Sequence, residues 1–374
     1  MPIRAMEDEK AIFTKEGDKI KFADKSPSGL IDRPILVFGG PNTGKTTIVE
    51  ELLILTKNYI PNHIVIAPMT SQTPYLKKFH QKCIKEDMTK ELFCKIWKRQ
   101  VQITKIYNIA NKLEILHGLF TRINNKQAQM LVNRTYQTAA GLKHAIESDP
   151  QLDYGNKKAQ IGSIDERCDK EILKIYKSTV RRFRLQLDTT SLSQHEQIAH
   201  EFLDINPKLM IVVDDCTEKL TKWMKAFKPN EENMFQNVFF RGRHNHISMI
   251  IIAHNDKFIL PDLRNAAAKI IYTDPQSFNI SVGRASNGFS KEEKTLALRC
   301  SKKIFAPLPQ GLKNHQKLCY IKNDYENPFQ YTIAEIYPDS IISSPMLNQL
   351  AEKIQLKTTE DEEISDFAKK LLQE

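Results

Sequence analysis

The stretch that most constrains this chain of 374 residues is ILVFGGPNTGKTT at residues 35–47, which a helix-like apolar run follows at 48–55. The four apolar residues predict a buried parallel strand, and the glycines allow a tight backbone turn after it. The spacing G-x-x-x-x-G-K-T is that of a phosphate-binding loop, in which backbone N–H groups and a helix N-terminus face an anion. An ordinary glycine-containing turn is the alternative, but the strand before the loop and the helix after it favour phosphate binding.

The residue types in this loop predict ATP and Mg²⁺ as ligands. Lys45 is expected to neutralise the β- and γ-phosphates, and the hydroxyl of Thr46 to take one coordination position on Mg²⁺. The residues predicted to bind the nucleotide are Gly39, Gly40, Pro41, Asn42, Thr43, Gly44, Lys45, Thr46 and Thr47.

Two later apolar runs end in polar side chains that belong to the same predicted site. Residues 209–213 are apolar and end at Asp214 and Asp215, and residues 247–253 form a second buried run that ends at His254. Ligands of open α/β sheets bind beyond the carboxyl ends of the strands, so these side chains are expected beside the loop. Asp214 is predicted to hold Mg²⁺ through a water, and Asp215 to polarise the attacking water. His254 is predicted to sense the γ-phosphate, with a structural histidine as the alternative.

The alternation of apolar runs with helix-like segments predicts an α/β fold, a P-loop NTPase with a mostly parallel, doubly wound sheet. Residues 19–22 predict a short edge strand, and residues 319–321 and 331–333 a C-terminal β-hairpin. The predicted divisions are an N-terminal extension at 1–33, the ATPase domain at 34–345 with a helical insertion at about 75–206, and an acidic helical tail at 346–374.

The formal net charge of +10 favours a polyanionic partner. Because residues 360–363 are all acidic, the rest of the chain is more basic than the total indicates. Two basic stretches, 77–99 and 174–184, are candidate DNA-facing segments. The alternative for each is a solvated helix face, with Tyr176 and Phe183 in the core rather than stacked on bases.

Other features exclude some classes of protein. No apolar run approaches the ~20 residues that span a bilayer, so no membrane span is predicted. Residues 1–6 lead into charged residues without a secretory signal, so the protein is expected to stay in the compartment where it is made. The six cysteines show no C-x-x-C pair and are expected to be reduced.

The order of these segments resembles the genome-packaging ATPases of large double-stranded DNA viruses and of adenovirus-like and virophage-like lineages, in the FtsK/HerA superfamily of P-loop motors. The resemblance extends over residues 35–337, with gaps in the helical middle. A strand between the phosphate loop and the Asp-Asp strand is the arrangement of that superfamily and argues against a nucleoside kinase. The segments that carry the resemblance are 39–47, 64–68 (IVIAP), 212–216 (VVDDC), 243–248 (RHNHIS), 253–255 (AHN) and 262–265 (DLRN).

The resemblance also implies roles for single residues. It implies a RecA/ASCE-like sheet, and it matches Arg243 to the arginine that such proteins present to the nucleotide of a neighbouring subunit, with Arg241 as the alternative. A surface arginine in a basic turn is the other interpretation of Arg243. Asp215 stands where cellular members commonly have Glu, and His254 where they commonly have Gln. Asn42 replaces a frequent Gly, and Asn is the residue with a side chain that best tolerates a left-handed backbone.

The function that the resemblance implies is an ATP-hydrolysing double-stranded DNA translocase that packages a viral genome. It implies a homo-oligomeric ring, DNA recognition that is largely independent of sequence, a capsid or vertex protein as partner, and a location in the infected host cell and the virion. Two alternatives remain at this stage: a P-loop helicase or DNA-segregation ATPase, and a nucleotide-gated DNA-binding regulatory protein with little turnover.

Overall fold

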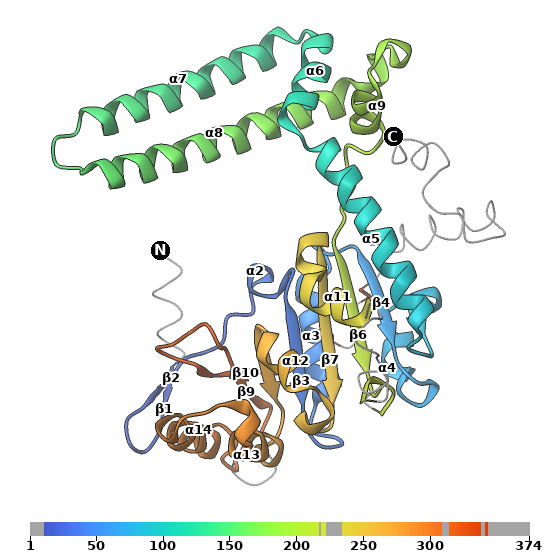
Figure 1. The fold of residues 1–374 in the computed structure, drawn as a ribbon, viewed down its shortest axis with the longest axis vertical. Helices are drawn as coiled ribbons and strands as arrows, with labels where there is room; N and C mark the ends of the chain where they lie inside the picture. Colours follow the sequence, from blue (N-terminus) through green and yellow to red (C-terminus); the bar gives the residue numbers. More distant parts are fainter. Residues whose placement is uncertain (1–10, 217, 222–233, 309–313, 338–340, 343–374) are drawn as a thin grey trace. The chain divides into compact units, whose positions relative to one another are not determined.

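The computed structural model describes residues 11–216, 218–221, 234–308, 314–337 and 341–342 (Figure 1). The chain divides into two compact units. One contains the described residues up to Gln100 and from Pro207 onward, and the other is Val101–Asn206. The predicted acidic tail at 346–374 lies outside the described residues.

The first unit is built on an eight-stranded sheet with the order β10-β9-β8-β3-β7-β6-β4-β5. All neighbouring strands are parallel except at β9, which pairs antiparallel with both β8 and β10. The predicted fold class is confirmed, including the C-terminal hairpin β9–β10. The strands are β3 (Pro34–Phe38), β4 (Asn62–Ile66), β5 (Ile84–Lys85), β6 (Leu209–Asp214), β7 (Ile247–Ala253), β8 (Lys269–Tyr272), β9 (Gln316–Tyr320) and β10 (Phe329–Ile333).

The order of the central strands places the ends of three of them at one edge of the sheet. β7 lies between β3 and β6, with Phe38 opposite Ala253 and Asp214 opposite Ile252. The order β8-β3-β7-β6-β4 is that of a RecA/ASCE-like sheet, in which one strand separates the phosphate-loop strand from the acid-bearing strand. Residues 39, 215 and 254 therefore leave the sheet side by side.

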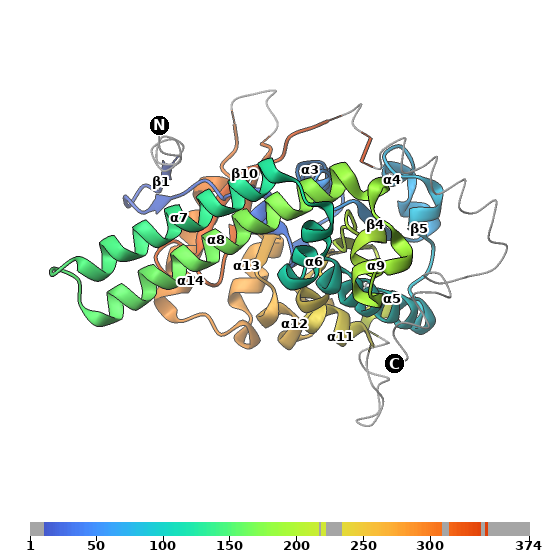
Figure 2. The same ribbon diagram turned by 90° about the horizontal axis from the view of Figure 1, so that it is seen from above.

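Helices cover both faces of this sheet, as its continuous apolar strands require. Side chains alternate along β3, so Ile35 and Val37 pack into one cluster and Leu36 and Phe38 into the other. Figure 2 shows α3 on one face and α11, α12 and α13 on the other. The helices around the sheet are α2 (Pro27–Leu30), α3 (Lys45–Thr56), α4 (Thr73–Leu76), the first half of α5 (Lys90–Ala110), α11 (Met234–Arg241), α12 (Pro261–Ala266), α13 (Pro275–Gly283) and α14 (Lys291–Ile304).

Short elements complete the first unit. The predicted edge strand at residues 19–22 is present as β2 (Lys19–Ile20), which pairs with β1 (Ile12–Phe13). The sequence predicts mostly helix from Tyr75, whereas the structure has the edge strand β5 at residues 84–85 before α5 begins. The short 3₁₀ turns are η1 (Met69–Ser71), η2 (Gln81–Cys83), η5 (Gly242–Asn245), η6 (Asp256–Phe258) and η7 (Ala285–Asn287).

The second unit is helical, and α7 and α8 run antiparallel beside each other (Figure 1). Asn125 and Asp153 cap their N-termini, and Ser193 starts α9 with a capping box. Tyr176 is 3% exposed, so it is a core residue. Arg181 in the basic stretch pairs with Asp204. The elements are the second half of α5, α6 (Leu113–Ile123), α7 (Lys126–Ser148), α8 (Tyr154–Phe183), α9 (Gln194–Glu201) and the turns η3 (Arg184–Gln186) and η4 (Thr189–Ser191).

Within the described part of the chain, none of the helices has the length and apolar character needed to cross a membrane.

Candidate nucleotide-binding site

The predicted phosphate loop connects β3 to α3 and has the backbone that its sequence requires. Asn42 has φ +59° and Gly44, the N-cap of α3, has φ +88°. Only glycine adopts such angles without strain, and asparagine tolerates them better than other residues with a side chain. Nζ of Lys45 donates to the Gly40 carbonyl at 2.6 Å, so the lysine folds back over the loop. Burial lowers the pKa of Lys45, while Asp214, Asp274 and Asp215 oppose this effect.

Three residues that were not predicted from the sequence, from the segment after β8 and from β9, form hydrogen bonds with the loop. The N–H of Gly40 donates to Oδ2 of Asp274 at 2.8 Å, and the hydroxyls of Thr43 and Thr273 lie 2.5 Å apart. From β9, Nζ of Lys317 donates to the Thr43 carbonyl at 3.0 Å. The sequence carries a signal only for Asp274, because an Asp followed by Pro is typical of a helix N-cap.

The first of the two predicted acids, Asp214, is the last residue of β6 and is 8% exposed. The buried hydroxyl of Tyr75 donates to its Oδ2 at 2.7 Å. Burial raises the pKa of Asp214, and the hydrogen bond from Tyr75 opposes that rise because it stabilises the carboxylate.

The second acid, Asp215, lies in the left-handed region with φ +55°. Such a backbone costs about 1 kcal/mol or more in a residue with a side chain, and it occurs preferentially at functional sites. The Ser71 hydroxyl donates to Oδ2 of Asp215 at 3.0 Å, and Nε2 of His254 lies 3.5 Å from Oδ1.

His254 connects the acid to the phosphate loop. Its Nδ1 lies 3.5 Å from Nζ of Lys45, and its Nε2 faces Asp215. A neutral imidazole with its proton on Nε2 satisfies both neighbours, because it donates to the carboxylate and accepts from the ammonium group. A cleft of about 370 Å³ opens beside Asp215 and His254. The structure therefore brings Lys45, the first residue of α3, together with Asp214 and Asp215 at the end of β6 and His254 after β7.

Arg243, the arginine predicted to act on a neighbouring subunit, does not lie beside the phosphate loop of its own chain. Arg243 is in η5, at the amino end of β7, where its Nε contacts His244 at 3.3 Å. β7 is seven residues long and spans about 23 Å, so Arg243 lies at the sheet edge opposite the phosphate loop. Arg243 and Arg241 are both exposed. Neither side chain can reach the nucleotide of its own chain.

The two residues predicted to hold the metal carry oxygen donors. Thr46 lies in the first turn of α3, and Asp214 supplies the carboxylate. Across the residues that the structure describes, no group of three or more His, Cys, Asp and Glu side chains is suited to hold a metal. One hydroxyl and one carboxylate fit Mg²⁺, which takes most of its ligands from phosphates and water.

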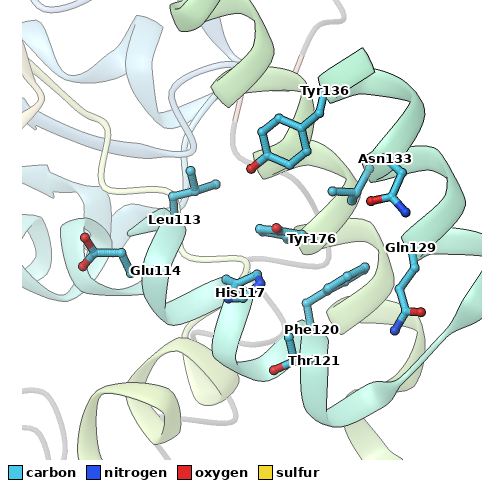
Figure 3. Close-up of a pocket in the computed structure, with 10 residues that line it drawn as sticks. Leu113, Glu114, His117, Phe120, Thr121, Gln129, Asn133, Tyr136 and Tyr176 are labelled. Atoms are coloured by element: carbon cyan, nitrogen blue, oxygen red, sulfur yellow. The ribbon is translucent and has the colours of Figure 1, made fainter. Parts of the chain in front are cut away.

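The helical unit has a pocket of its own, of about 510 Å³ (Figure 3). Aromatic and amide side chains of α6, α7 and α8 line it, and the rings of Phe120 and Tyr176 lie 4.5 Å apart. None of the predicted site residues contributes to this pocket.

The fold and the loop define the class of this protein: it is a P-loop NTPase with a RecA/ASCE-like strand order. None of the known family models matches the chain.

Sequence relatives come from African swine fever virus. One protein, named uncharacterized protein B354L, is 23% identical over 371 residues, which cover 93% of this chain and 95% of the relative. The B354L protein of a second isolate is 23% identical over 337 residues, 84% of this chain and 85% of the relative. The resemblance drawn from the sequence motifs predicts a viral protein, and these relatives are viral.

Solved structures with some similarity include the genome packaging NTPase B204 of Sulfolobus turreted icosahedral virus 2 in complex with ATP-gammaS. It is 11% identical, with a TM-score of 0.34, and the superposition covers 82% of this chain and 98% of that chain. The EssC ATPases 2 and 3 of Geobacillus thermodenitrificans are 14% identical, with a TM-score of 0.34 over 93% of this chain and 49% of that chain.

Proposed function

We propose that this protein is a Mg²⁺-dependent ATPase that translocates double-stranded DNA and packages a viral genome into its capsid. The observation that carries the proposal is the contact of Lys45, His254 and Asp215 at the carboxyl ends of three strands, with Asp214 beside them. A phosphate loop alone is compatible with many reactions. The two carboxylates beside this loop support hydrolysis, because one is suited to hold a metal and the other to polarise a water.

The roles follow from the chemistry of phosphoryl transfer, in which positioning and charge stabilisation do most of the work. The loop amides and Lys45 bind the β- and γ-phosphates, Thr46 coordinates Mg²⁺, and Asp214 holds Mg²⁺ through a water. Bound Mg²⁺ neutralises the negative charge of the phosphate oxygens. Asp215 orients the attacking water. His254 lies between Asp215 and Lys45, a position from which it can respond to loss of the γ-phosphate.

The site is proposed to be completed by a second subunit. Arg243 and the phosphate loop lie at opposite ends of β7, which spans about 23 Å, so Arg243 can act only on the nucleotide of another subunit. An arginine supplied in this way contributes about 10³-fold or more to the rate, and it makes hydrolysis depend on assembly into a ring.

The net charge of the chain supports DNA as the partner, and the viral relatives support a role in a virus. A net charge of +10 suits a partner whose backbone is a polyanion, and binding through phosphates is largely independent of base sequence. The viral relatives support a location in an infected cell. There we propose the viral genome as the cargo and a capsid or vertex protein as the docking partner.

The direct test is steady-state ATP hydrolysis with and without duplex DNA at low salt. We expect DNA to stimulate hydrolysis, and we expect the stimulation to fall steeply as salt rises. Forked DNA distinguishes a pump from a helicase, because a duplex translocase moves along it without displacing a strand. Negligible turnover with saturating DNA would instead identify a nucleotide-gated regulator.

A further inference from the structure

The segment that follows β4, Met69–Leu76, contacts both acids of the site. β4 pairs in parallel with β6, so its carboxyl end lies beside Asp214. The segment folds as η1 and α4, and Nε2 of Gln72 donates to the Ala67 carbonyl at 2.8 Å, which ties the turn to the end of the strand. We call residues 69–76 the support segment.

Tyr75 is the residue of the support segment that contacts Asp214. Its side chain is fully buried in the apolar cluster on the α3 face of the sheet, and its ring lies 6.5 Å from that of Phe79. The packed ring holds the hydroxyl 2.7 Å from Oδ2 of Asp214. A buried carboxylate requires a donor, and this one comes from a side chain with little freedom to move.

We propose that Tyr75 is a positioning residue that orients the Asp214 carboxylate toward Mg²⁺. The inference rests on the proposed function, because that function assigns Mg²⁺ to Asp214. A hydrogen bond to a carboxylate that holds a metal, directly or through a water, restricts its rotation and directs its remaining lone pairs. Removal of such an orienting partner commonly costs about 10- to 100-fold in metal affinity. Ser71 of the same segment donates to Asp215 at 3.0 Å, so the support segment holds both acids.

Tyr75→Phe tests the proposal, since it removes the hydroxyl and keeps the ring. A fluorescent ATP analogue is titrated onto the full-length protein in EDTA and at increasing Mg²⁺. We expect unchanged affinity in EDTA, and a Mg²⁺ concentration for half-maximal tightening that rises about 10-fold or more in the variant. Phe79→Leu is the matched control. It disturbs the same cluster without touching the hydrogen bond, so it should lower thermal stability and leave the Mg²⁺ midpoint unchanged.

Two results would overturn the proposal. One is a Mg²⁺ midpoint for Tyr75→Phe equal to that of the unmodified protein. The other is an equal shift in Tyr75→Phe and Phe79→Leu, which would mean that the tyrosine acts through packing alone. In an Asp214→Asn background, Tyr75→Phe should have no further effect on the midpoint. Because binding is measured without turnover, a protein that binds Mg²⁺ and the analogue but does not hydrolyse ATP refutes the proposed function and leaves this inference standing.

Discussion

Alanine should weaken nucleotide binding at Gly39 of the phosphate loop but not at its neighbour Gly40. A Cβ on Gly39 would overlap Oγ1 of Thr273 and lie 2.7 Å from Oγ1 of Thr43 and 3.0 Å from Oδ2 of Asp274. A Cβ on Gly40 would meet only Cγ2 of Thr43, at an ordinary 3.7 Å. Gly39→Ala therefore forces the loop away from β8, whereas Gly40→Ala does not.

The loss of nucleotide affinity in Gly39→Ala can be worked out from the free-energy cost of overpacking. Overpacking of one methyl group against groups that cannot retreat typically costs about 1–3 kcal/mol. The free protein can relieve the overlap by moving the loop, but a bound nucleotide requires the loop amides in place, so the cost appears in binding. At about 1.4 kcal/mol per factor of ten, Gly39→Ala should weaken nucleotide affinity about 10- to 100-fold.

The assay is equilibrium titration of a fluorescent ATP analogue, with thermal unfolding to show that each variant is folded. Thr273→Ala removes the overlapping hydroxyl, and Thr43 keeps the Gly40 carbonyl as acceptor at 2.9 Å. The pair Gly39→Ala with Thr273→Ala should therefore recover part of the lost affinity. Equal losses for Gly39→Ala and Gly40→Ala, or an affinity of Gly39→Ala within twofold of the unmodified protein, would show that the close contacts at Gly39 do not restrict the loop.

Three further predictions concern stability and assembly. Lys25→Met should lower the free energy of unfolding in urea by about 3–5 kcal/mol, because it leaves the 1%-exposed carboxylate of Glu51 without its cation. Adding Glu51→Gln should restore part of that loss. Additive free-energy losses in the double variant would contradict this coupling. Burial lowers the pKa of His63 from 6.5 to about 4, so below pH 6.5 the unfolded chain binds a proton that the folded protein does not. The free energy of unfolding should therefore fall by about 3 kcal/mol as pH falls from 6.5 toward 4. His63→Asn should flatten this part of the pH–stability curve, and an unchanged slope would assign it to other groups. Subunits with Arg243→Ala should bind ATP normally yet suppress hydrolysis by neighbours in mixed rings, with Arg241→Ala as the comparison; defective ATP binding would indicate a structural role.

Much of the site is local in sequence and was predictable for that reason. The phosphate loop is one continuous segment, and the strand ends that carry Asp214 and His254 follow long apolar runs. Because parallel strands of an open sheet end at a shared edge, the meeting of these residues follows from topology. The same rule places Arg243 at the opposite edge, since it precedes a strand rather than following one.

The residues that support the site were not predictable from local patterns. Tyr75 and Ser71 contact acids that lie 139 and 144 residues further along the chain, and Lys317 reaches the loop across 274 residues. Their sequence surroundings resemble ordinary surface turns and a hairpin strand. The edge strand β5 is only two residues long, too short to show an alternating pattern.

ATP hydrolysis at low salt, measured with and without duplex DNA for the unmodified protein and for Lys45→Ala, shows whether this protein is a DNA-driven ATPase. Nζ of Lys45 donates to the Gly40 carbonyl of the loop and lies 3.5 Å from Nδ1 of His254. Lys45→Ala therefore removes the positive charge that we propose binds the phosphates. We expect DNA-stimulated hydrolysis by the unmodified protein and none by Lys45→Ala. Hydrolysis that DNA does not affect, or an unchanged rate in Lys45→Ala, would contradict this expectation.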